Sequence, residues 1–256
     1  MRRLRNALPA VVVLAAALGV WELYVDLGAV STLILPAPHA IAVSLYEDRS
    51  LLWSNLLVTA EEVLLGMVLG MIAAFVLSVV IHFSRTLRRA LYPLLVASQT
   101  VPIAMIAPVL ILWLGFGLGP KVLIVALVTF FPVVVTTSSA LEGVDGELLK
   151  LMRTFDASRY RTFREVELPA ALPGLFTGAR IAAVFAWIGA VFAEWSGASA
   201  GLGYLFNVSL PQFLVARAWA CVVLLSLGAI ALFAGLGLLQ RLLLPWAQRP
   251  TELGAR

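Results

Sequence analysis

Apolar residues run along this chain in long blocks that short polar segments separate. Six blocks of 19 to 25 residues stand out, and they cover residues 7–25, 58–81, 93–114, 122–140, 175–193 and 219–243. About 20 apolar residues are needed for a helix to cross about 30 Å of hydrocarbon. Backbone amides in lipid must also bond within their own segment. The pattern predicts an all-α integral membrane protein with six transmembrane helices.

The composition supports a membrane protein. Of the 256 residues, 62% are hydrophobic and 12% are charged, whereas a soluble domain has about 25% charged residues. We expect one transmembrane domain over residues 1–256. Met1–Arg5 before an apolar run also fits a signal peptide, but this run is longer than a signal's apolar core, so we favour an uncleaved first span. The single cysteine, Cys221, lies in an apolar block and excludes a disulfide within the chain.

Lys and Arg gather in alternate segments between the blocks. With the N-terminus in the cytoplasm, 15 of the 18 fall on the cytoplasmic side, and the outer side holds Arg49, Lys121 and Arg217. Positive residues concentrate on the cytoplasmic side of membrane proteins. Both termini are therefore predicted to be cytoplasmic. The net charge of +4 is a topology signal, and we expect no nucleic-acid partner.

The longest inner segment, residues 141–172, has its own helical pattern. We expect two short amphipathic helices, over 147–155 and over 159–167, with a break at 156–158 and an end before Pro169. Apolar residues at helical spacing form one face of the first helix: Leu148, Leu151, Met152 and Phe155. Two interpretations stay open. The helix lies on lipid headgroups, or it docks to a partner protein.

This inner segment resembles the signature loop of permease subunits of binding-protein-dependent ABC importers. ASRYRTFREVELPAALPGL (157–175) is similar to the second half of that signature. In the first half, Lys150, Leu151 and Met152 stand at the family's Glu-Ala-Ala, and Asp156 stands at its Gly. That Gly permits a left-handed backbone, which Asp tolerates better than most residues.

Other segments extend the resemblance over nearly the whole chain. LPAPHAI (35–41) and TVPIAMIAPVLILWLGFGLGPK (100–121) resemble the nitrate, taurine and alkanesulfonate permease group. The Lys-Leu-Met variant, GAVFAEWSGASAGLGYL (189–205) and LLPWAQ (243–248) resemble permeases for thiamine-precursor pyrimidines.

The resemblance implies a type I, MetI-like permease of the bacterial inner membrane. Such a permease pairs with a second copy, a cytoplasmic ATPase dimer and an external binding protein. The cargo would be a small polar solute, either hydroxymethylpyrimidine or another thiamine precursor; sulfonate, taurine or nitrate-like anions are the alternative. Segment 141–172 would be the coupling loop. The ATPase-coupling residues would be Lys150, Leu151, Met152, Arg153, Asp156, Ala157 and Ser158.

Polar residues inside or near spans are costly and often functional. Gln99 and Thr100, beside Pro102, and Glu194, at the outer end of the fifth span, are candidates for lining the translocation path. The alternative for Gln99 and Thr100 is hydrogen bonding between helices. Glu62 is expected to be solvated at a span entrance.

No metal site is expected, since His39 and His82 lie at loop edges with no second ligand at metal spacing, and both are expected to be solvated. Two small-xxx-small pairs allow close helix approach, and packing within one subunit is favoured over the dimer interface: Gly66/Gly70 and Gly174/Gly178.

Sequence motifs for catalysis are absent. Gly115–Lys121 lacks the Walker A spacing, and neither HExxH nor GxSxG occurs. The chain therefore needs a separate ATPase subunit and no cofactor. An ion-coupled secondary transporter or a membrane-embedded enzyme remains the alternative from another class. The first would need paired mid-membrane ionisable residues in an inverted repeat, and the second a cluster of His, Asp or Glu at one membrane face.

Overall fold

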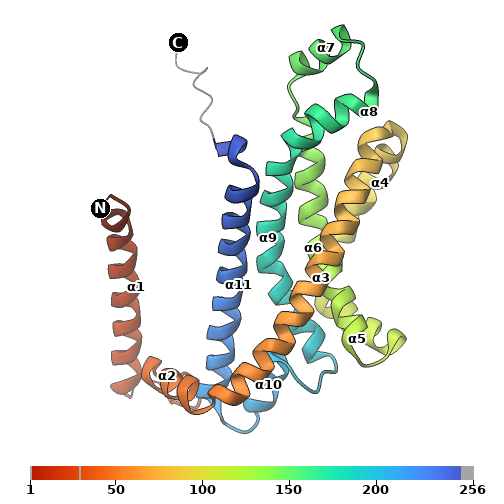
Figure 1. The fold of residues 1–256 in the computed structure, drawn as a ribbon. Helices are drawn as coiled ribbons and strands as arrows, with labels where there is room; N and C mark the ends of the chain where they lie inside the picture. The colour runs from red at the N-terminus through yellow and green to blue at the C-terminus, as the bar shows by residue number, and fades with distance from the viewer. Residues whose placement is uncertain (1, 29, 249–256) are drawn as a thin grey trace. The chain divides into compact units, whose positions relative to one another are not determined.

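The computed structural model describes residues 2–28 and 30–248, and every regular element in that part is helical (Figure 1). This confirms the all-α prediction. The long helices are α1 (Arg2–Asp26), α3 (Arg49–Phe83), α6 (Leu118–Glu142), α9 (Leu168–Trp195) and α11 (Val215–Leu243). The shorter helices are α2 (Pro38–Glu47), α4 (Arg85–Ser98), α5 (Ile103–Leu114), α7 (Gly146–Thr154), α8 (Arg159–Thr162), η1 (Phe163–Glu167), α10 (Leu202–Ser209) and η2 (Pro245–Gln248).

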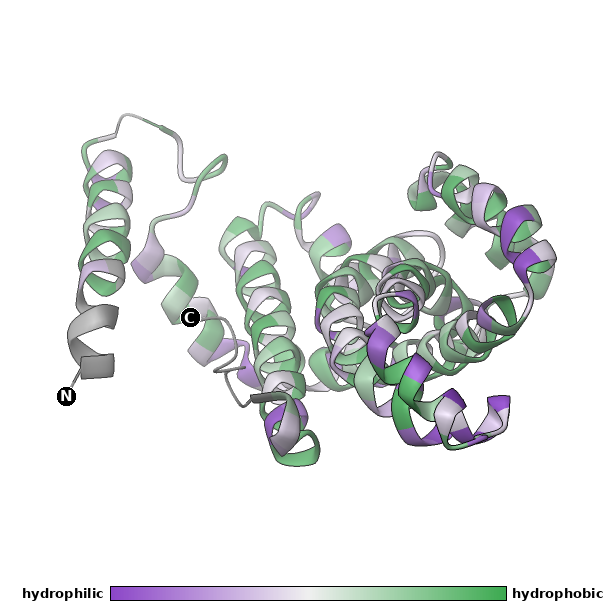
Figure 2. Ribbon diagram, turned by 90° about the horizontal axis from the view of Figure 1, so that it is seen from above, coloured by the Kyte–Doolittle hydropathy of each residue, from purple (hydrophilic) through white to green (hydrophobic). Residues whose placement is uncertain are grey.

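Several of these helices are suited to a membrane. Within the described residues, the helices over 49–83, 118–142, 159–195 and 215–243 are long and apolar enough to cross it, and α4 with α5 adds a fifth candidate if that pair is one span. Apolar residues predominate along the long helices that Figure 2 colours, as expected for helices in lipid. The predicted first span falls on α1, and some of its side chains lie outside the part of the chain that the structure describes. Arg249 and Arg256 also lie outside that part. The six-span count and the cytoplasmic termini stay predictions.

The predicted span over 93–114 is broken. It divides into α4 and α5, which are bent by 98° at their junction. Pro102 caps α5 in an extended conformation, because its ring removes the backbone N–H and disfavours a helical residue before it. The prediction of one continuous helix here was wrong, and the polar residues Gln99 and Thr100 lie at the bend.

The chain forms two compact units, Met1–Thr59 with Ser199–Ser226, and Ala60–Ala198 with Leu227–Arg256. In the first unit, α2, the start of α3, α10 and the start of α11 share a buried core. Cys221 is fully buried in that core, as a small apolar packing residue. The core comprises Ile41, Leu52, Leu202, Leu205, Ala220 and Cys221.

In the second unit, α6 packs closely against α3 and α9. A Cβ added at Gly66 would lie 2.4 Å from Val125 Cβ, and one added at Gly178 would lie 2.0 Å from Thr136 Oγ1. Gly70 and Gly174 meet α6 equally closely. Both small-xxx-small pairs therefore serve packing within one subunit, as predicted.

The segment between α6 and α9 holds the two expected helices, α7 and α8. Asp156, between them, has a φ of 52°, so this position uses the left-handed backbone that the family's Gly would allow. The second helix does not end before Pro169, which corrects that prediction. It continues through the π-helix η1 into α9. The wide π-turn accommodates Pro169, whose ring would clash with a carbonyl of a regular α-turn, and it absorbs the change of register.

Candidate functional site

The first helix of the predicted coupling loop, α7, has an uncovered apolar face. Leu148, Leu151 and Phe155 are 46%, 50% and 69% exposed. They lie on one side because their spacing follows the helical turn. Asp145 caps the start of α7 by accepting a hydrogen bond from the Glu147 N–H at 2.8 Å. A short helix thus presents apolar side chains with no cover among the described residues.

The other predicted coupling residues lie along α7 and in the turn before α8. Lys150, Arg153 and Asp156 are exposed, while Met152 and Ala157 are half-buried. Ser158 caps α8, since its hydroxyl accepts from the Arg161 N–H at 3.3 Å. The predicted residues therefore lie in two short runs close together in the chain, but they have different roles in the local structure.

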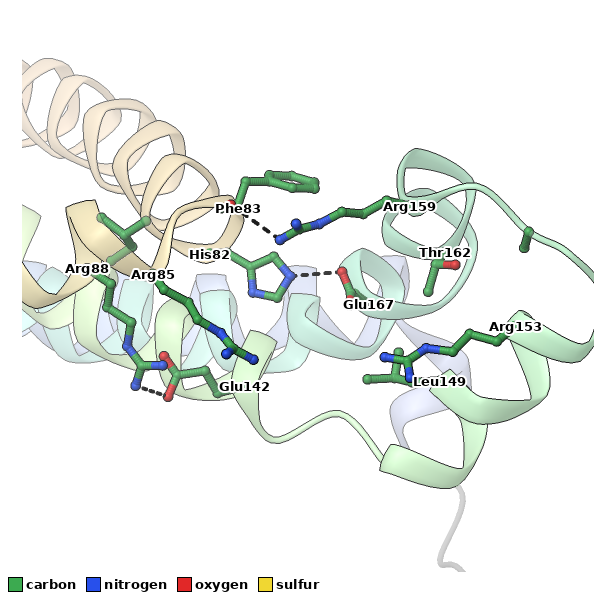
Figure 3. Close-up of a pocket in the computed structure, with 12 residues that line it drawn as sticks. His82, Phe83, Arg85, Arg88, Glu142, Leu149, Arg153, Arg159, Thr162 and Glu167 are labelled. Carbon is green, nitrogen blue, oxygen red and sulfur yellow. Dashed lines mark hydrogen bonds and ion pairs between the residues drawn. The ribbon is translucent and has the colours of Figure 1, made fainter.

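The opposite side of α7 borders a cavity of about 630 Å³, closed on its other side by the ends of α3, α4, α6 and η1 (Figure 3). His82 bonds to Glu167 at 2.8 Å, and Arg88 pairs with Glu142. The expectation that His82 is simply solvated was wrong, because the fold brings Glu167 to it over a separation of 85 residues. The charged residues around the cavity are Arg85, Arg88, Arg153, Arg159, Glu142 and Glu167.

Gln99 and Thr100 do not bond between helices. The Gln99 amide donates to the Ser98 hydroxyl at 3.3 Å, and the Thr100 hydroxyl donates to the Ala97 carbonyl at 2.8 Å. Both side chains are exposed at the bend between α4 and α5. The geometry therefore disfavours interhelical hydrogen bonding and leaves their place in the translocation path a prediction.

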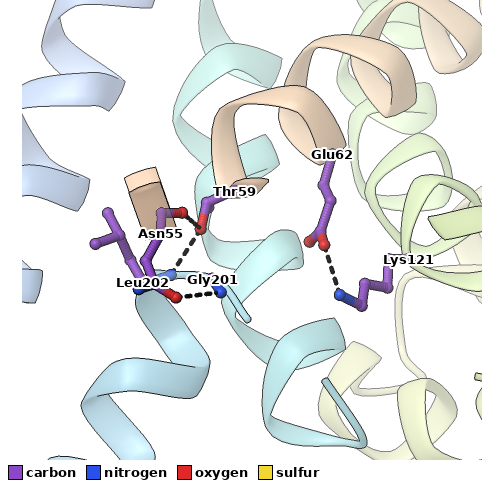
Figure 4. A network of polar contacts seen from close by, with 6 residues as sticks. All are labelled: Asn55, Thr59, Glu62, Lys121, Gly201 and Leu202. Carbon is purple, nitrogen blue, oxygen red and sulfur yellow. Dashed lines mark hydrogen bonds and ion pairs between the residues drawn. The ribbon is translucent and has the colours of Figure 1, made fainter. Parts of the chain in front are cut away.

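A buried ionic cluster lies inside the second unit, between α3, α6 and α9. Lys121 Nζ donates to Glu62 Oε1 at 2.6 Å, with side chains 11% and 1% exposed (Figure 4). Glu194 is also buried and is an electrostatic neighbour of Glu62. The expectation of a solvated Glu62 was wrong. Glu62 falls within the predicted span over 58–81, and that position is the signal that favoured burial.

The first unit holds a separate polar network. Asn55 Oδ1 accepts from the Gly201 N–H at 2.7 Å, and Thr59 Oγ1 accepts from the Leu202 N–H at 2.8 Å (Figure 4). These bonds satisfy N–H groups at the start of α10, which otherwise lack partners. α3 thereby fixes the position of α10.

Near that network, Arg217 holds Asp48 with two bonds, Nη2 to Oδ1 at 2.6 Å and Nε to Oδ2 at 2.9 Å. These bonds hold the pKa of Asp48 below its usual value. The pair joins the start of α11 to the turn before α3 within the first unit.

One group of side chains has the composition of a cation site. Ligand atoms of Glu22, Asp26 and His39 lie within 4.8 Å of one another. Sequence spacing shows no second ligand near His39, but in the fold Glu22 pairs with His39 across 17 residues of the chain. That hydrogen bond raises the pKa of His39. The ion pair between His39 and Glu22 explains why these two side chains lie together.

Comparisons with known proteins fit a multi-helix transport subunit. A family model described as binding-protein-dependent transport system inner membrane component matches residues 66–249, and an LrgB-like model matches residues 6–110, less than half of the chain. The chain belongs to the family of binding-protein-dependent ABC transporter permeases. It is therefore a multi-pass inner-membrane subunit of an ABC importer and not itself an enzyme. Its family works with a separate ATPase and a binding protein.

Individual relatives carry different substrates in their names. The chain is 36% identical to the formylaminopyrimidine transport permease of Halalkalibacterium halodurans, over 84% of this chain and 87% of the relative. It is 37% identical to the riboflavin transport system permease of Chloroflexus aurantiacus, over 88% and 85%. The taurine transport system permease of Escherichia coli is 30% identical, over 91% and 87%.

A solved structure agrees on the fold. A chain of the inward-facing methionine ABC transporter MetNI superposes with a TM-score of 0.50 at 20% identity, covering 72% of this chain and 94% of that one. This confirms the predicted MetI-like fold.

Proposed function

We propose that this permease carries a small nitrogen heterocycle, hydroxymethylpyrimidine or another thiamine precursor, delivered by an external binding protein. The support is the higher identity to permeases named for formylaminopyrimidine and riboflavin than to the one named for taurine. Sulfonate, taurine or nitrate-like anions are the second candidate, on the weaker but still extensive similarity to the taurine permease.

Coupling to the ATPase is assigned to α7, in an inner loop over residues 141–172. The main support is that Leu148, Leu151 and Phe155 form an exposed apolar face. On a segment rich in charged residues, such a face favours docking to a protein. Lys150 replaces the family's Glu, so the matching ATPase surface is expected to offer an acidic residue there.

A second copy of the chain is the proposed partner within the membrane, with both termini in the cytoplasm and six spans per copy. The support is the bend between α4 and α5. Irregular backbone at membrane depth needs protein or water around it, not lipid. Exposed Gln99 and Thr100 at this bend would then line a path between two copies, and lipid would cover the remaining apolar faces. Glu194 also stays a candidate for lining the path, as a member of the buried ionic cluster with Glu62 and Lys121.

Uptake by proteoliposomes tests the substrate. The permease is reconstituted with the ATPase and binding protein encoded beside it, and uptake of radiolabelled hydroxymethylpyrimidine is compared with that of taurine. ATP-dependent uptake of the pyrimidine alone is the expected result. Uptake of taurine alone would reverse the order of the two candidates.

Thiol labelling tests the path. Cys221 is buried and is the only cysteine of the chain, so a new cysteine reports without background. Thr100→Cys is expected to react with a water-soluble maleimide in the assembled transporter, and substrate-loaded binding protein with ATP should change the rate. A rate equal to that of wild type, which has only Cys221, would contradict a wet path at the bend.

A further inference from the structure

The cavity beside α7 holds more positive charge than its acidic groups balance. Four arginines and two glutamates line it. Glu142 already pairs with Arg88, and Glu167 with His82. Among the residues that the structure describes, no ion pair or side-chain hydrogen bond involves Arg85 or Arg153. Arg85 and Arg153 therefore face a shared space whose two carboxylates are already paired with other groups.

The two arginines come from different elements but point into the same space. Arg85 is the first residue of α4, and Arg153 lies in the last turn of α7. Arg153 lies one turn after Leu149, so both point to the cavity side of α7, away from the exposed apolar face. Figure 3 shows both arginine side chains directed at the cavity. The side of α7 proposed for the ATPase is thus not the side that carries this charge.

The chemistry of the lining selects the ligand. A guanidinium group offers a planar fork of N–H donors that fits phosphate oxygens, and it stays charged at any physiological pH. Two such forks from opposite walls suit an anion with several oxygens. A volume of about 630 Å³ accommodates a phosphate group together with its bound water or the glycerol of a headgroup.

We infer that this cavity binds a phosphate-group anion between Arg85 and Arg153. An anionic phospholipid headgroup and free phosphate share that chemistry. The headgroup has additional support, because α4 carries Arg88 and Arg89 beside Tyr92 along a second hollow of about 580 Å³. Basic pockets at the cytoplasmic ends of membrane helices suit anionic headgroups. The inference stands whether or not α7 docks to an ATPase.

The test uses the full chain purified in nanodiscs, without ATPase. Inorganic phosphate is titrated into phosphatidylcholine nanodiscs and followed by ³¹P saturation-transfer NMR. In a second arm, native mass spectrometry counts phosphatidylglycerol molecules retained from mixed phosphatidylglycerol–phosphatidylcholine nanodiscs. The variants are Arg85→Ala/Arg153→Ala and the charge-keeping Arg85→Lys/Arg153→Lys. The matched control is Arg164→Ala, an exposed arginine of the same segment outside the cavity.

We expect at least tenfold weaker binding in the alanine pair, partial retention in the lysine pair, and a change below twofold in Arg164→Ala. Retained phosphatidylglycerol that phosphate displaces would identify the headgroup, and phosphate binding without lipid retention would identify the free anion. Wild type that binds neither would overturn the inference, and so would equal losses in Arg164→Ala. The wild-type measurements decide even if the alanine pair fails to fold.

Discussion

Helices α6 and α7 follow one another in the chain, and both carry many apolar residues. α6 buries Val125, Val133 and Val134 completely, because the glycines of α3 and α9 leave room for close approach. α7 leaves Leu151 and Phe155 exposed. Buried apolar area contributes about 25 cal/mol per Å², so α6 contributes to the stability of this chain. The same gain is still available to α7 when a partner covers it.

The largest effect should come from filling the space between α6 and α9. Gly178→Leu would place a Cβ 2.0 Å from Thr136 Oγ1 and 2.9 Å from Val133 Cα, and overpacking of this kind costs about 3 kcal/mol or more. We expect loss of the monodisperse peak in fluorescence-detected size-exclusion chromatography. Gly235→Leu is the control, since nothing lies within 4 Å of a Cβ there. Equal behaviour of the two variants would refute the packing assigned to α6.

The next effect concerns charge in the same core. Lys121→Met removes the donor to buried Glu62, and breaking one side of a buried pair costs about 3–5 kcal/mol. The thermal unfolding midpoint should fall clearly, and Lys121→Met/Glu62→Met should recover part of the loss. Lys150→Met, on exposed α7, should leave the midpoint unchanged. A double variant no more stable than the single one would show that the pair does not carry this energy.

A smaller effect is expected from pH in the first unit. Arg217 lowers the pKa of Asp48, so the ionised carboxylate favours the folded state. This stability is present above the ordinary aspartate pKa of about 4 and is lost as pH falls through the lowered value. Unfolding midpoints measured downward from pH 6 should fall more for wild type than for Asp48→Asn. Parallel curves would contradict the role of the pair.

The smallest effect tests the backbone between α7 and α8. Asp156 has a φ of 52°, which costs a residue with a Cβ about 1 kcal/mol relative to Gly. Asp156→Gly should slow hydrogen exchange of the α7 amides, and Asp156→Ala should speed it. Identical exchange in both variants would mean that the left-handed turn does not limit the order of α7.

Much of the fold follows from the sequence, because long apolar blocks and helical periodicity are local signals. The left-handed residue Asp156 was also predictable, since its place between two helices restricts the backbone. The bend at Pro102 and the continuity through Pro169 were not. A proline can end a helix or be accommodated within one, depending on the turn before it. At Pro169 the preceding turn is the π-helix η1, which the sequence does not indicate.

The ionic contacts were beyond prediction for a different reason. Glu62 and Lys121 are 59 residues apart, and His82 and Glu167 are 85 apart. Such pairs depend on how helices pack, which periodicity does not specify. The predicted coupling residues, by contrast, are neighbours in the chain, so a single loop motif was enough to name them.

The central claim is that the exposed face of α7 receives the ATPase. The most direct test measures capture of the genomically adjacent ATPase by the permease in nanodiscs, comparing Leu151→Asp with Thr154→Asp. Both add one carboxylate to exposed positions of α7, but only Leu151 lies on the apolar face. We predict at least tenfold weaker capture for Leu151→Asp and near-normal capture for Thr154→Asp, with equal thermal stability. Equal capture by both variants would contradict the docking role of α7.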